Sequence, residues 1–169
     1  MGTDPIFLTS EIRRMERETG VVLPSLMERA GSAAADLAMK LISEKSRDVL
    51  VLAGPGNNGG DARIAAARLQ EKFFRVTVAT SPRELPLDRS WGLVIDGLFG
   101  IGLARNITGD YAELVQFANR QDCPVLALDV PSGIQSDTGE VRRACCPGAR
   151  PPRRWRAGCC GRLRGGSRR

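Results

Sequence analysis

The chain has 169 residues, 42% of them hydrophobic, and a formal net charge of +6. That length and composition fit one globular domain with a core of its own. No apolar run approaches the length of a membrane span and no secretory leader is evident, so we expect a cytoplasmic protein. The sequence contains no histidine, which excludes Ser-His-Asp and Cys-His catalysis and histidine-ligated metal sites.

The positive charge is confined to residues 142–169, which carry ten arginines and no acidic residue. Residues 1–141 carry 15 Lys and Arg against all 19 Asp and Glu, a net charge of −4. This mildly acidic part of the chain gives no reason to expect a nucleic-acid partner. Cys123, the single cysteine of residues 1–141, lies beside Pro124 at the start of an apolar run, and we expect it to be a small buried residue.

Two helices are predicted before the first strand. The first begins near Thr9 and ends at Gly20, because glycine suits the position after a helix. The second begins at Ser25 and continues to about Ile42, with apolar residues at three- and four-residue spacings. This helix contains four small residues close together: Gly31, Ala33, Ala34 and Ala35. The first interpretation is that they pack closely against another element, and the second is that they form a homodimer seam.

The apolar run 49–53 predicts a buried parallel strand, and the glycine-rich turn that follows it leads into a helix over 62–69. The spacing Gly54-x-Gly56-x-x-Gly59 matches the dinucleotide fingerprint, in which N–H groups at a helix start face an anion. A tight turn that needs glycine only for its backbone is the competing interpretation. Asn57 and Asn58 add side-chain oxygens that suit a cation or a polar ring as well as a phosphate.

Three further strands are predicted over 74–79, 91–96 and 124–129, with a helix over about 110–119 between the last two. No acidic residue ends the strand 74–79, where dinucleotide folds place one for the ribose hydroxyls, which counts against an ordinary dehydrogenase. Asp96 and Asp129 end the other two strands; capping of the next helix is the structural alternative for Asp96. Because parallel strands end at one edge of a sheet, a site is expected where polar residues follow three of them: Asn57, Asn58, Asp96, Asp129 and Ser132.

Four motifs in order resemble the NAD(P)H-hydrate epimerase family, also described as the YjeF N-terminal domain. They are LMERAG at 26–31, GPGNNGGD at 54–61, DGLFGIG at 96–102, and DVPSG at 129–133 followed by DTG at 137–139. The resemblance covers residues 9–141. It agrees with the expected fold, a Rossmann-like, three-layer, doubly wound α/β domain with a mostly parallel sheet and N-terminal helices. It implies an isomerase that interconverts the R and S epimers of hydrated NADH or NADPH, so that a partner NAD(P)H-hydrate dehydratase can restore the cofactor.

The same resemblance implies the site residues. A potassium ion is expected at Asn58, Asp96 and Ser132, whose amide, carboxylate and hydroxyl oxygens suit a hard cation. Asp129 is expected to bind the substrate, and with no histidine present it is the best-placed acid/base, with a pKa raised by partial burial. The hydrated nucleotide is expected against two runs, Asn57, Asn58, Gly59, Gly60 and Asp61, and Gly100, Ile101, Gly102, Leu103, Ala104, Arg105 and Asn106.

Two features depart from the family pattern. Ala62 stands where the family has a further glycine, and its methyl group either crowds a ligand or is tolerated. Residues 142–169 do not match the family, show no helix or strand period and have a composition typical of GC-rich DNA read out of frame. We therefore expect a disordered or frameshifted tail, a sheet without its last strands and an exposed apolar edge. The adjacent cysteine pairs 145–146 and 159–160 lack the spacing of a zinc site.

Two other functions stay open. The first is a catalytically inactive module of the same fold that binds a nucleotide or a partner. The joint presence of Asp96, Asp129 and Ser132 disfavours it, because a scaffold does not need all three. The second is the conventional NAD-dependent dehydrogenase, which the residues at 80–83 and the absence of histidine disfavour.

Overall fold

The computed structural model describes residues 7–20, 23–42, 46–141 and 155–157. No helix in this part of the chain is both long enough and apolar enough to cross a membrane. The elements are α1 (Thr9–Thr19), α2 (Leu26–Leu41), β1 (Asp48–Ala53), α3 (Asn57–Glu71), β2 (Arg75–Ala79), the short 3₁₀ helix η1 (Pro82–Glu84), β3 (Leu93–Gly97), α4 (Asp110–Arg120), β4 (Val125–Ala127) and β5 (Trp155–Ala157).

The strands form one parallel sheet in the order β2-β1-β3-β4-β5. β1 and β3 lie next to each other near its centre, with Leu52 opposite Asp96. All five residues of β3, and Val49 to Ala53 of β1, are buried, as expected for strands covered on both faces. The predicted doubly wound α/β fold is confirmed.

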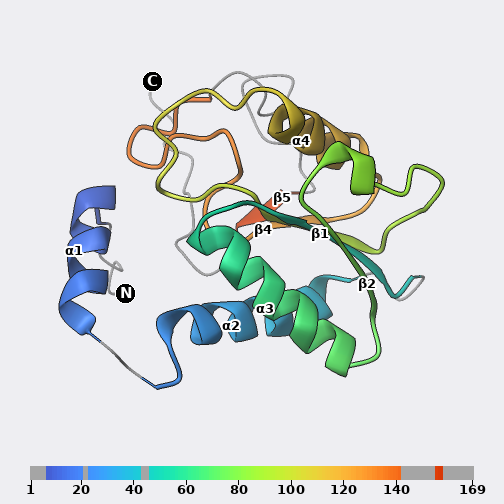
Figure 1. The fold of residues 1–169 in the computed structure, drawn as a ribbon, viewed down its shortest axis with the longest axis horizontal. Helices are drawn as coiled ribbons and strands as arrows, with labels where there is room; N and C mark the ends of the chain where they lie inside the picture. The colour runs from blue at the N-terminus through green and yellow to red at the C-terminus, as the bar shows by residue number, and fades with distance from the viewer. Residues whose placement is uncertain (1–6, 21–22, 43–45, 142–154, 158–169) are drawn as a thin grey trace, which may run out of the picture.

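Helices cover both faces of the sheet (Figure 1). Alanines of α2 and α3 pack with Val51 and Ile95 on one face, and α4 packs with Leu52 and Val94 on the other. The chain changes faces between two neighbouring strands, since β1 leads into α3 and β3 leads into α4. In open α/β sheets, a crevice for a ligand lies beyond the carboxyl ends of the strands at this point.

The small residues of α2 pack within the chain. Gly31, Ala34 and Ala35 are buried, and a Cβ placed on Gly31 would lie 2.6 Å from the Cβ of Ile64 in α3. Close packing, the first interpretation of these residues, is therefore confirmed. Ala33 is exposed on α2.

Both N-terminal helices have the predicted ends. Ser25 caps α2: its Oγ accepts from the N–H of Glu28 at 3.2 Å, while the Glu28 carboxylate accepts from the N–H of Ser25 at 2.7 Å. Gly20 follows α1 with a φ of 65°, a conformation that favours glycine.

Two elements differ from the sequence prediction. The helix predicted from Ala62 begins at Asn57, so the second half of the glycine motif is its first turn, fixed by a 3.1 Å hydrogen bond from Gly60 N to Gly56 O. For the segment 142–169 the sequence predicts a disordered or frameshifted tail and a sheet without its last strands; this is wrong for Trp155–Ala157, which pair with β4 as β5. Main-chain hydrogen bonds to an edge strand need no side-chain pattern, and for this reason periodicity gives no signal for β5. The remainder of that segment lies outside the described residues.

Candidate functional site

The turn after β1 packs directly against the loop after β3. Gly54 N donates to Gly97 O at 3.0 Å, and a Cβ on Gly54 would overlap the carbonyl oxygen of Leu98. A Cβ on Gly59 would overlap the carbonyl oxygen of Gly54, whereas one on Gly56 would meet nothing within 4 Å. Two glycines of the fingerprint are thus required by close backbone packing, which supports the tight-turn interpretation for them.

Arg63 holds this turn from α3. Its Nη1 donates to Gly54 O at 3.1 Å and to Gly59 O at 3.0 Å. One side chain therefore links the end of β1 to the first turn of α3.

Asp96 and Ser132 form a buried polar pair between the ends of β3 and β4. Asp96 Oδ1 accepts from Ser132 Oγ at 2.7 Å and from Leu98 N at 3.2 Å, and Oδ2 accepts from Ser132 N at 2.8 Å. Asp96 is only 1% exposed, and burial raises its pKa although the hydrogen bonds from Ser132 and Leu98 oppose that shift. Ser132 Oγ also accepts from Phe99 N at 3.0 Å.

Asp129 lies two residues beyond β4 and faces the loop that follows β3. Its Oδ2 accepts from Ile101 N at 2.6 Å, while its Oδ1 is buried with no hydrogen-bond partner among the described residues. A Cβ on Gly100 would overlap Oδ2, so glycine makes this approach possible. Burial raises the pKa of Asp129, and the hydrogen bond from Ile101 opposes the shift. The carboxyl therefore has one fixed oxygen and one unsatisfied oxygen.

Asp61 and Asn58 bring polar groups from α3 to the same end of the sheet. Burial, followed by the charges of Asp129 and Glu16, raises the pKa of Asp61 to about 6. The side-chain Nδ2 of Asn58 is buried and has no partner among the described residues. A 180° turn of the asparagine amide exchanges its NH2 group and its oxygen. The atom at this unsatisfied position can therefore be a hydrogen-bond donor or an oxygen ligand for a cation.

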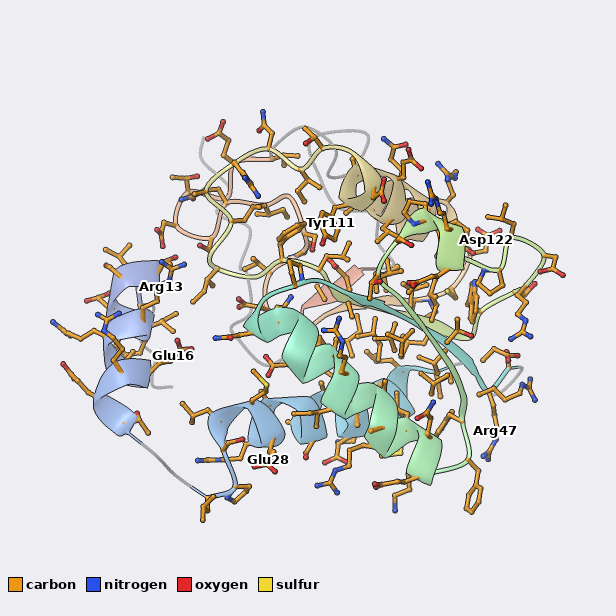
Figure 2. All side chains as sticks on the ribbon, viewed as in Figure 1. Arg13, Glu16, Glu28, Arg47, Tyr111 and Asp122 are labelled. Atoms are coloured by element: carbon orange, nitrogen blue, oxygen red, sulfur yellow. The ribbon has the colours of Figure 1, made fainter. Side chains whose placement is uncertain are left out.

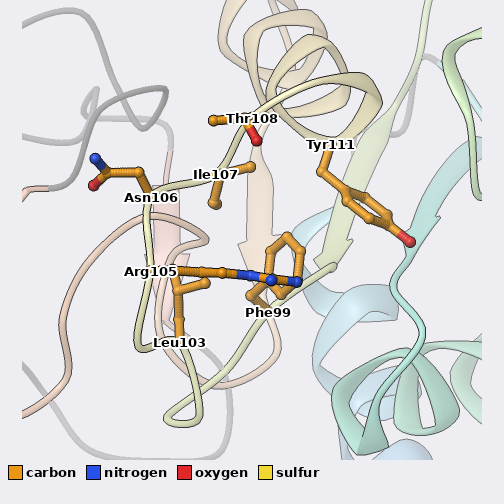
Figure 3. Close-up of a pocket in the computed structure, with 7 residues that line it drawn as sticks. All are labelled: Phe99, Leu103, Arg105, Asn106, Ile107, Thr108 and Tyr111. Atoms are coloured by element: carbon orange, nitrogen blue, oxygen red, sulfur yellow. The ribbon is translucent and has the colours of Figure 1, made fainter.

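The second predicted nucleotide-binding run divides into three parts. Gly100 and Ile101 contact Asp129, and Gly102 lies beside α1. Leu103, Arg105 and Asn106 line a cavity of about 230 Å³ whose other walls are Phe99, Ile107, Thr108 and Tyr111, as Figure 3 shows. Ala104 stands between Leu103 and Arg105 in the sequence and is exposed.

Helix α1 stands to one side of the sheet and its covering helices (Figure 2), and two of its side chains, Arg13 and Glu16, connect it with the site. A Cβ on Gly102 would lie 2.8 Å from Nη2 of Arg13, and Glu16 contributes to the raised pKa of Asp61. The start of α1 is fixed by Asp137, whose Oδ1 accepts from both N and Oγ1 of Thr9 at 2.8 Å. Asp137 of the DTG motif thus has a structural role, and no periodicity in the sequence could have indicated it.

Ala62 and Cys123 face the protein interior. Ala62 is fully buried, and a Cβ on Gly97 would overlap its methyl group, which therefore points toward β3. Of the two interpretations of Ala62, the tolerated methyl agrees with this position. Cys123 is 6% exposed, as predicted.

No group of three or more His, Cys, Asp or Glu side chains suited to a metal occurs in the described part of the chain.

Comparison with known proteins identifies the family. The family model described as "YjeF-related protein N-terminus" matches residues 24–91 and 80–150. The chain belongs to this YjeF N-terminal family. Its match continues nine residues beyond Val141, so the expectation that none of the segment 142–169 matches the family is wrong.

Similar proteins support that membership. A protein of Bordetella pertussis named NAD(P)H-hydrate epimerase is 42% identical over an alignment that covers 77% of this chain and 67% of that protein. One of Achromobacter xylosoxidans with the same name is 40% identical over an alignment that covers 95% of this chain and 86% of its own. The crystal structure of yeast ynu0, YNL200c, has the same fold, with a TM-score of 0.69 at 20% identity over 84% of this chain and 76% of that one.

Proposed function

We propose that this YjeF-family protein is an NAD(P)H-hydrate epimerase, an isomerase that interconverts the R and S epimers of hydrated NADH and NADPH. The observation that carries this function is the 40% identity, across 95% of the chain, to a protein of that name. The site agrees with the chemistry, because three carboxyl groups with raised pKa values gather where the sheet changes faces.

Asp129 is proposed as the acid/base. Inverting a carbon that bears a hydroxyl next to a ring nitrogen requires proton transfer to or from that group. Ile101 N–H fixes Oδ2 of Asp129, which leaves the unpartnered Oδ1 to hold or accept the proton at the substrate hydroxyl. Burial raises the pKa of this carboxyl toward the working pH of an enzyme. A residue whose pKa is near that pH can both donate and accept a proton.

The two loops that meet at the switch point are proposed to bind the hydrated nucleotide. The first turn of α3 offers unpaired N–H groups and the positive end of the helix dipole to a phosphate, with Asn57, Asn58, Gly59, Gly60 and Asp61 on that turn. The run from Gly100 to Asn106 contributes the opposite wall, with Arg105 as its cation.

A potassium ion is proposed at Asn58, Asp96 and Ser132, and the residues present fit it. Asp96 is a buried carboxylate whose described partners are all neutral donors, so a monovalent cation would offset its charge. Nδ2 of Asn58 is the unsatisfied atom, and a 180° turn of the amide would bring the side-chain oxygen to that position as a second ligand at the adjoining helix start. When bound, the ion supplies fixed positive charge beside the nucleotide-binding loops.

Thermal unfolding in different chloride salts tests the ion independently of activity. We expect a higher Tm in KCl than in choline chloride at equal ionic strength, since a ligand that binds only the folded state stabilises it. Asn58→Leu should remove most of that difference, whereas Asp88→Asn, at an exposed loop position, should keep it. Equal Tm values for the wild type in both salts would refute potassium binding.

An assay on the isolated R epimer of hydrated NADH separates the enzyme from an inactive binding module of the same fold. Formation of the S epimer by the wild-type protein supports the proposed reaction. Tight binding of the hydrated nucleotide without conversion would favour the module instead.

Two partners are proposed with this function. An NAD(P)H-hydrate dehydratase that acts on the S epimer would complete the repair, in the cytoplasm where we place both enzymes. A homodimer through the N-terminal helices is supported by their exposed apolar residues Leu8, Met15, Leu23 and Leu26. Light scattering of the wild type and of Leu26→Glu tests it: a monomeric wild type would contradict the dimer.

Residues 151–169, which lie beyond the family match, are proposed to be read out of frame. Their composition supports this, and resequencing the gene tests it directly. A +1 or −1 shift near the codon of Arg150 should restore family-like sequence, and an intact frame would refute the idea.

A further inference from the structure

The cavity beside α4 has walls of mixed character. Its volume of about 230 Å³ is below the range of roughly 300–1,000 Å³ typical of pockets that hold a whole drug-sized ligand. A complete dinucleotide therefore does not fit inside it, but a single ring with one attached group does. The wall residues lie in the segment 99–108 and in the first turn of α4.

Two aromatic rings form one side of this cavity. The ring centroids of Phe99 and Tyr111 lie 5.1 Å apart with an interplanar angle of 79°, an edge-to-face pair. Both side chains are only half-buried, so ring surface stays open toward the cavity. Nucleobases stack favourably on such rings.

Arg105 and Thr108 supply the polar part of the walls. Figure 3 shows the side chain of Arg105 extending toward Phe99. Arg105 is exposed and forms no ion pair with any described residue. A guanidinium binds phosphate through paired donors, and the hydroxyl of Thr108 can donate or accept. The walls thus suit a flat aromatic ring that carries an anionic group.

One short segment joins this cavity to the acid site. Phe99 donates its N–H to Ser132 Oγ at 3.0 Å while its ring lines the cavity. Two residues later, the N–H of Ile101 binds Asp129. The main chain of the segment therefore contacts the proposed reacting site, and its side chains line a second one beside it. A ligand with a ring at each end can occupy both.

We propose that this cavity holds the adenine ring of the hydrated dinucleotide. Tyr111 and Phe99 are its aromatic walls, and Arg105 binds the phosphate next to the adenosine. Tyr111 lies outside the two nucleotide-binding runs and is a further substrate-binding residue. The inference rests on the proposed epimerase function for the identity of the ligand.

Calorimetric titration with AMP tests the cavity without any turnover. The wild type should bind AMP, and Tyr111→Leu should weaken the affinity about tenfold or more, because losing a stacked base costs about 1–3 kcal/mol. Tyr111→Phe, which keeps the ring, should retain AMP binding with an unchanged Tm. Arg105→Gln should weaken binding of AMP but leave that of adenosine unchanged.

Steady-state kinetics separates a binding role of Tyr111 from a structural one. Tyr111→Leu should raise KM for hydrated NADH and leave kcat and KM unchanged for hydrated NMNH, which lacks the adenosine half. Equal losses on both substrates would show a merely structural role and overturn the inference.

The two proposals fail in distinguishable ways. Epimerase activity in a protein that does not bind AMP would overturn the adenine site and leave the function intact. AMP binding that depends on Tyr111, in a protein with no epimerase activity, would overturn the function and leave the adenine site.

Discussion

Asp129 presents one carboxyl oxygen to the N–H of Ile101 at 2.6 Å and keeps the other buried without a partner among the described residues. A buried acceptor without a donor costs free energy, typically about 1–3 kcal/mol. Such groups concentrate at functional sites, where a ligand completes the hydrogen bonding. The pair therefore joins the end of β4 to the glycine-rich loop after β3 and leaves one oxygen for a substrate.

Gly100→Ala is expected to displace the Asp129 carboxyl, since the added methyl would overlap Oδ2. The substitution should destabilise the wild type but have a much smaller effect in an Asp129→Ala background. Chemical denaturation of the wild type, the two single variants and the double variant gives the coupling energy between the two substitutions. Residues in contact typically give coupling energies of about 0.5–3 kcal/mol. Additive effects would mean that Gly100 and Asp129 are not in contact.

Asp61→Asn is expected to stabilise the protein in a pH-dependent way. The pKa of Asp61 is raised to about 6 in the fold, so the folded state binds the proton more strongly than the unfolded state, with its ordinary value near 4. The favourable contribution of the protonated acid is complete below pH 4 and is lost as pH rises through 6.

The Tm of Asp61→Asn minus that of the wild type should therefore grow between pH 4 and pH 8. A gain of a few degrees is expected, because about 1 kcal/mol shifts Tm by ~2–4 °C in a chain of this size. Asp36→Asn, at an exposed position on α2, is the matched control. A difference independent of pH would contradict the raised pKa of Asp61.

Gly54→Ala should destabilise the fold strongly, whereas Gly56→Ala in the same turn should not. The first methyl would overlap the carbonyl of Leu98, so the main chain has to move, at a cost of about 1–3 kcal/mol or more. The second methyl meets nothing within 4 Å, and its cost should stay below about 1 kcal/mol. Urea unfolding compares the two, and equal losses would show that the close approach at Gly54 does not limit stability.

Asp137→Ala should release the start of α1, because Thr9 loses both hydrogen bonds to the carboxylate. Trypsin should then cleave faster after Arg13, Arg14 and Arg17, which can be followed by mass spectrometry. Glu140→Ala, at an exposed position of the same loop, is the control. An unchanged cleavage rate in Asp137→Ala would mean that other contacts hold α1 in place.

The strands and the acids at their ends could be predicted from the sequence for a simple physical reason. A buried parallel strand is a continuous apolar run, so the runs ending near Ala53, Asp96 and Asp129 locate the sheet, and parallel topology brings their ends to one edge. The convergence of Asp96 and Ser132 follows from that rule, although their hydrogen bonds depend on loop conformation.

Other features carry no comparable signal. The approach of Arg13 to Gly102 depends on how α1 docks, and the start of α1 is held by hydrogen bonds from Thr9 to Ser136 and Asp137, which are far away in the sequence. The cavity at Phe99 and Tyr111 forms between a loop and a helix turn, where neither periodicity nor spacing reports side-chain direction. β5 is only three residues long, too short for any hydrophobic period.

The most direct measurement of the central claim is the rate at which the isolated R epimer of hydrated NADH is converted to the S epimer by three proteins: the wild type, Asp129→Asn, and Asp88→Asn as a control at an exposed loop position. Removing a general acid/base typically costs about 10²–10⁴-fold in rate. We expect a loss of that size in Asp129→Asn alone, with folding and nucleotide binding retained. Equal rates in the wild type and Asp129→Asn would contradict the account.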